Sequence, residues 1–142
     1  MSRVNNWDLA LFRWMKKKLG RPFRWGRTDC ACLVKGASRA MYGRNVFPHI
    51  ASWSSLRTAK ETLDGLDDIP AVLASQGATQ VKRAFAQSGD IAYTPGLDEE
   101  GLPRLAVVWQ GKALVSTVAD GVRIVELADL ADDTEFWRLP NE

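Results

Sequence analysis

The sequence contains a single histidine, His49, among its 142 residues. Imidazole is the most frequent general base in proteins and a frequent metal ligand, so one copy restricts both kinds of chemistry. Cysteine is nearly as scarce, because Cys30 and Cys32 are the only two, and one intervening residue is too short a spacing for zinc. On a helix their side chains would point to different faces, which disfavours a disulfide. We therefore expect no metal site and no cofactor.

An excess of charge is also missing. Nineteen Lys and Arg stand against 17 Asp and Glu, and the resulting net charge of +2 is too small to favour a nucleic acid or a membrane surface as partner. No apolar run approaches the roughly 18 residues that a membrane span needs. Asn5, Asn6 and Asp8 occupy the place where a signal peptide has its apolar stretch. These absences predict a protein made in the cytoplasm, without membrane insertion or nucleic-acid binding.

Apolar and charged residues, by contrast, are present in ordinary proportions, 46% and 25% of the chain. Such a composition is typical of globular proteins and excludes disorder over most of the length. The length favours one domain, which we expect to span residues 1–142.

Hydrophobic periodicity predicts helices in the first half of the chain and strands in the second. The four expected helices cover residues 5–19, 29–42, 55–64 and 69–76. The six expected strands lie near residues 79–81, 91–93, 105–109, 113–117, 122–127 and 136–139. Asn5 or Asn6 is the expected cap of the first helix. Helices followed by an antiparallel meander indicate an α+β fold.

Cys30 stands where reactive cysteines are often found. With Thr28 or Asp29 as N-cap, Cys30 opens the second helix, whose first N–H groups stabilise a thiolate. This placement is typical of a nucleophile. The alternative is a small buried residue that fills a contact between helix and sheet. Cys32 fits only the packing role, and for Cys30 the residues alone leave both roles open.

Residues 23–34, with the sequence FRWGRTDCACLV, resemble the nucleophile motif of NlpC-type papain-like cell-wall cysteine peptidases. In those enzymes an aromatic-Gly turn leads to Asp-Cys, and the cysteine opens a helix. Gly89-Asp90 and residues 105–115 resemble the segments that follow. The run RPFRWGRTDC at residues 21–30, together with Trp7, Gly89-Asp90 and Trp137-Arg138, is more similar still to a family of small phage and prophage tail proteins, known as a domain of unknown function. The resemblance implies a papain-like NlpC-type fold, with N-terminal helices packed on a C-terminal antiparallel β-sheet.

One catalytic group of the peptidases has no counterpart here. Active members carry a histidine at the start of the hairpin strand as general base, and the matching position is Leu105 or its neighbour Arg104. Neither side chain accepts a proton from a thiol at neutral pH. His49 would have to return along a helix of about 18–20 Å to reach Cys30. The alternative is a histidine that packs in its loop or lies on the surface.

Two aspartates are open to a similar pair of interpretations. Asp29 precedes Cys30, and Asp90 follows Gly89 in the turn before a strand. Each is either a cap or turn residue or the group that orients a catalytic base.

The resemblance implies a structural component of a bacteriophage tail tip, made in the bacterial cytoplasm and located in the virion. Its partners would be the hub and the distal tail protein, in a symmetric hetero-oligomer, and its active site would be incomplete. Six tryptophans are more than one small core usually hides, so Trp53, Trp109 and Trp137 are interface candidates.

Two alternatives remain. One is an active cysteine peptidase or amidase that cleaves peptidoglycan stem peptides during DNA delivery. Cys30 would then be the nucleophile, His49 or a partner's histidine the base, and N–H groups near Cys30 the oxyanion hole. The other is a free-standing bacterial housekeeping enzyme.

Overall fold

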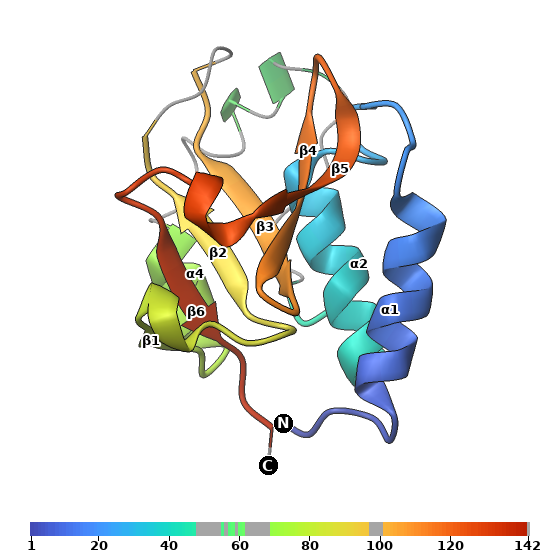
Figure 1. Cartoon of the computed structure of the whole chain (residues 1–142), viewed down its shortest axis with the longest axis vertical. Helices are drawn as coiled ribbons and strands as arrows, with labels where there is room; N and C mark the ends of the chain where they lie inside the picture. Colours follow the sequence, from blue (N-terminus) through green and yellow to red (C-terminus); the bar gives the residue numbers. More distant parts are fainter. Residues whose placement is uncertain (48–54, 56, 59, 62–68, 97–100, 142) are drawn as a thin grey trace.

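The computed structural model describes residues 1–47, 55, 57–58, 60–61, 69–96 and 101–141. Its helices pack on one antiparallel sheet, which confirms the α+β fold (Figure 1). The helices are α1 (Trp7–Lys18), α2 (Cys30–Tyr42) and α4 (Ile69–Ser75). The strands are β1 (Thr79–Val81), β2 (Ile91–Thr94), β3 (Arg104–Trp109), β4 (Lys112–Thr117), β5 (Gly121–Glu126) and β6 (Glu135–Arg138). His49 and Trp53 lie outside the described residues, as do residues 56, 59 and 62–64 of the helix expected over 55–64.

The order of the strands corrects the expected meander. The sheet runs β1-β6-β2-β3-β4-β5, so the last strand of the chain lies between the first two. Strand β6 pairs with β1 on one side and with β2 on the other, both antiparallel. Local periodicity predicts each strand but carries no information on this insertion, since the partners are far apart in sequence.

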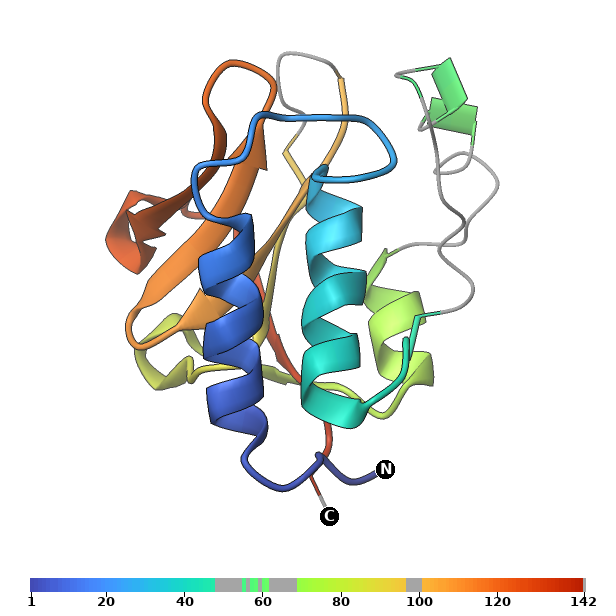
Figure 2. The same ribbon diagram turned by 90° about the vertical axis from the view of Figure 1, so that its right-hand side faces the viewer.

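Helices α1 and α2 lie side by side and cover one face of the sheet (Figure 2). Leu11 and Met15 of α1 are buried against the apolar stripe of α2, which includes Leu33 and Ala37. The cap expected for α1 is absent: Asn6 holds the N-cap position with φ 57° and makes no capping hydrogen bond through its side chain.

Both faces of the sheet carry apolar side chains. Leu105, Val107 and Leu114 belong to the large core beneath the helices. Ala106, Val108 and other alternate residues of the same strands form a smaller core on the opposite face, around Phe136. The middle of β3 is therefore buried on both sides, as in a central strand.

Candidate functional site

The segment that carries the peptidase-like motif is a turn with a defined set of hydrogen bonds. The Thr28 hydroxyl donates to the carbonyl of Pro22 over 2.7 Å and accepts from the N–H of Arg24 over 2.8 Å. Phe23 and Trp25 pack edge to face, with ring centroids 4.8 Å apart. The turn leads into α2, and Cys30 is the first residue of this helix, as predicted.

Asp29 is the N-cap of α2. Its Oδ1 accepts from the N–H of Cys32 over 3.0 Å and its Oδ2 from the N–H of Gly26 over 2.6 Å. The carboxylate is buried and also lies 3.5 Å from the thiol of Cys32. Both oxygens are thus used by the cap and the turn, which places Asp29 in the capping role of the two that the sequence allows.

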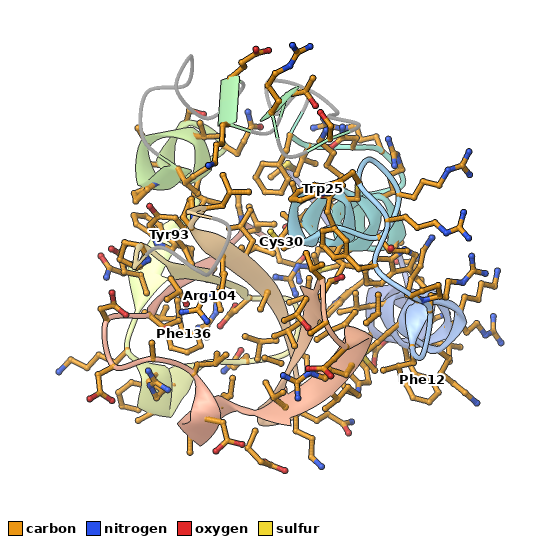
Figure 3. All side chains as sticks on the ribbon, turned by 90° about the horizontal axis from the view of Figure 1, so that it is seen from above. Phe12, Trp25, Cys30, Tyr93, Arg104 and Phe136 are labelled. Atoms are coloured by element: carbon orange, nitrogen blue, oxygen red, sulfur yellow. The ribbon has the colours of Figure 1, made fainter. Side chains whose placement is uncertain are left out.

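Cys30 lies between the turn and the sheet. Figure 3 shows it with Trp25 on one side and with Tyr93 and Arg104, at the ends of β2 and β3, on the other. Cys30 is half-buried and packs against the large core. The thiol is therefore only partly accessible from solvent.

Leu105 occupies the sheet position where the resemblance expects a histidine. It pairs with Tyr93 across β2 and β3, is only 7% exposed, and belongs to the core against which Cys30 packs. Arg104 is exposed and precedes Leu105 in the strand, so its side chain points to the opposite face of the sheet. The described part of the chain contains no histidine, and a pairing of His49 with Cys30 lies outside it.

Cys32 has the properties of a packing residue. Burial, followed by the neighbouring carboxylate of Asp29 and the hydrogen bond to it, raises the pKa of the Cys32 thiol to about 12. The thiol is therefore protonated at neutral pH and is not a nucleophile.

Asp90 is held in an ion pair that the sequence did not predict. The guanidinium of Arg138 donates from Nε to Oδ1 over 3.1 Å and from Nη2 to Oδ2 over 3.0 Å. The N–H of Gln87 donates to Oδ2 over 2.8 Å, and Arg138 also reaches the carbonyl of Phe85. The hydrogen bond to Asp90 raises the pKa of Arg138. Asp90 of the Gly-Asp turn and Arg138 of the C-terminal Trp-Arg pair therefore bind each other. Both oxygens of Asp90 are used in this ion pair and in the turn, which corresponds to the structural role of the two that the sequence allows.

The two described interface candidates are half-buried. Trp109 stacks on Phe12 of α1 with ring centroids 5.7 Å apart, and Trp137 donates from Nε1 to Glu135 over 3.1 Å. Phe12 itself is 37% exposed, so Trp109 forms the floor of a surface patch. A role of either tryptophan at an interface stays a prediction.

The described residues contain no group of three or more His, Cys, Asp or Glu side chains arranged to hold a metal ion. No helix in this part of the chain has the length and apolar character to cross a membrane.

Sequence reasoning missed a set of basic side chains on α2. Lys35 follows Cys32 by three residues and Arg39 follows Lys35 by four, so all three share one helix face. That spacing was available in the sequence, but the basic groups of the preceding turn and of α1 meet them only in the fold.

Comparison with known proteins matches several solved structures and a family model. No curated protein matches the chain. Among solved structures, RipD of Mycobacterium tuberculosis, described as a non-catalytic NlpC/p60 domain protein adapted to a peptidoglycan-binding function, is similar with a TM-score of 0.49. The two are 15% identical over 96% of this chain and 100% of that chain, so the likeness concerns the fold alone. The family described as a domain of unknown function (DUF6950) matches residues 2–139, and the chain belongs to it.

Proposed function

We propose that this protein is a structural component of a bacteriophage tail tip, in which a peptidase-like fold serves assembly and the active site is incomplete. The observation that carries the proposal is the burial of Leu105 in the core against which Cys30 packs, at the position where the resemblance expects the base of a peptidase. The resemblance of residues 21–30, Gly89-Asp90 and Trp137-Arg138 to small phage tail proteins supports the tail-tip role.

The chemistry of amide cleavage explains why this substitution matters. A cysteine peptidase needs a group that takes the thiol proton and returns it to the leaving amine. Leucine does neither, and Asp29 has both oxygens engaged in the helix cap. The start of a helix stabilises a thiolate at Cys30 but supplies no acid for the leaving group. General acid–base catalysis contributes about 10²–10⁴-fold to such reactions, so its loss removes useful turnover.

An assembly role is supported by an exposed apolar patch on α1, made of Leu9 and Phe12 over Trp109. Leu9 is 44% exposed, and Phe12 stacks on Trp109 while remaining in contact with solvent. Exposed aliphatic and aromatic groups that adjoin each other are typical of protein contact sites.

Hydrolysis is tested first. The purified protein is incubated with peptidoglycan fragments, and the products are identified by mass spectrometry, with Cys30→Ser and His49→Ala variants in parallel. We expect no cleavage above the level of Cys30→Ser. Cleavage that disappears in Cys30→Ser would establish the competing function, a cysteine peptidase or amidase of stem peptides, and the dependence on His49 would identify its base.

Assembly is tested in particles. The strain that encodes the chain is induced, and the purified particles are analysed by mass spectrometry and by immunogold labelling of the tail tip. We expect the chain in the particles, and loss of incorporation when Leu9 and Phe12 are both changed to serine. Val118→Ser is the matched control, since Val118 is 51% exposed in the turn between β4 and β5. Normal tails that lack the chain would refute the proposal.

A further inference from the structure

A groove between α1 and α2 has no role in the proposed function. Its volume is about 540 Å³, and α1 contributes Trp14 and Lys18 to its wall. Lys35 and Arg39 line it from α2, and Arg27 of the preceding turn lines one end. The two helices that form it stand next to each other in Figure 2.

The groove is lined by hydrogen-bond donors without acceptors. Within the described residues, the charged groups of Lys18, Arg27, Lys35 and Arg39 make no ion pair and no hydrogen bond. The indole N–H of Trp14 has no acceptor there either. The neighbouring carboxylate is that of Asp29, whose oxygens already accept from two backbone N–H groups. Four basic side chains therefore line one concave surface, where the carboxylate of Asp29 offsets part of their positive charge.

Lys35 is the most buried of these four basic residues. The residue is only 6% exposed, so its aliphatic stem is buried, while its ammonium has no hydrogen-bonded partner in the part of the chain described and keeps contact with solvent in the groove. Burial lowers the pKa of Lys35, partly offset by the nearby Cys32 and Asp29. The Cys32 thiol is neutral at physiological pH and supplies no counter-charge. Because desolvation disfavours the charged form of Lys35, an anion in the groove would stabilise that form.

We propose that this groove binds a phosphate-bearing ligand. A phosphate group carries up to two negative charges and three acceptor oxygens, which matches donors that converge from α1, α2 and the turn. Carboxylates have two oxygens and satisfy fewer of these donors at once. The groove is larger than a single phosphate, so a ligand with several phosphates fits it best. The site lies apart from Cys30 and does not depend on the role proposed for the whole protein.

Isothermal titration calorimetry at low salt tests the site with sodium tripolyphosphate as the probe. We expect saturable binding that weakens about tenfold or more in Lys35→Met, because one charge-assisted hydrogen bond is lost while the buried stem is kept. Arg39→Met should weaken binding similarly, and since Arg39 is exposed, its replacement leaves the fold intact. Lys17→Met is the matched control, because Lys17 is exposed on α1 and does not line the groove.

Three results would overturn the proposal. One is the absence of binding heat with tripolyphosphate. Another is an equal effect of Lys17→Met and Arg39→Met, which would indicate diffuse attraction to a basic surface. The third is equally tight binding of citrate, a tricarboxylate, which would remove the preference for phosphate oxygens. Circular dichroism of each variant separates lost binding from lost structure.

Discussion

Replacing Arg138 with methionine should destabilise the fold through a carboxylate more than forty residues away in sequence. The side chain of Asp90 is 1% exposed, and both of its oxygens accept from the Arg138 guanidinium. Removal of one partner from a fully buried pair costs about 3–5 kcal/mol, because the remaining charge has lost its compensation. Arg138 is 32% exposed, so solvent moderates the loss, and the N–H of Gln87 still donates to Asp90. We therefore expect a loss of about 2–4 kcal/mol.

Urea unfolding followed by circular dichroism measures this loss. Arg123→Met is the matched control, because Arg123 forms an exposed pair with Asp120, for which about 0–1 kcal/mol is expected. The double variant Asp90→Asn with Arg138→Met should recover part of the stability, since it leaves no buried charge. A free energy of unfolding for Arg138→Met within about 1 kcal/mol of the unmodified protein would refute the reasoning.

Three further predictions concern single sites. Gly121→Ala should destabilise the protein by about 2–4 kcal/mol in thermal or urea unfolding, because φ is +72° and a Cβ would collide with the carbonyl of Arg21. Unchanged stability would contradict the close approach of Gly121 to the Arg21 carbonyl. Asp29→Ala should cost about 0.5–2 kcal/mol by loss of the α2 cap, whereas Asp8→Ala, an exposed residue of α1, should change little. The fold raises the pKa of the Cys32 thiol from 9.0 to about 12, so the thiol ionises at lower pH in the unfolded chain than in the folded one. The free energy of unfolding that this shift contributes is therefore fully present below pH 9 and declines as the pH rises toward 12. A Cys32→Ala variant should show a shallower decline over that range in urea unfolding, and an identical profile would contradict the shift.

Most of the elements were predictable because their signals are local. The Asp-Cys sequence marks the start of α2, and Asp29 does accept from the N–H of Cys32. Helix α1 begins at Trp7 inside the expected range, yet the chain reaches it through Asn6 in a left-handed conformation and without a side-chain cap. A capping residue type indicates where a helix can begin, but the path of the preceding chain decides whether the cap forms.

The candidate site was predictable only in part. The sequence identified Cys30, its position at the start of α2, and the absence of a histidine at the position of Leu105. These features depend only on the order of the residues and not on the fold. It could not choose between the two roles of Asp90, because the deciding partner, Arg138, lies on β6. The insertion of β6 beside β2 brings the two together, and no local pattern predicts that insertion.

The sequence by itself determined most of the helices and strands, the position of Cys30, and the absence of a histidine at positions 104 and 105. These features follow from the spacing of apolar residues and from hydrogen bonds between residues only a few positions apart in the chain. Only the tertiary structure decided that Leu105 is buried in the core against which Cys30 packs, that Asp90 pairs with Arg138, and that basic residues of two helices and a turn share a groove. Burial and charge pairing depend on which distant segments meet, and packing of the whole chain sets those distances.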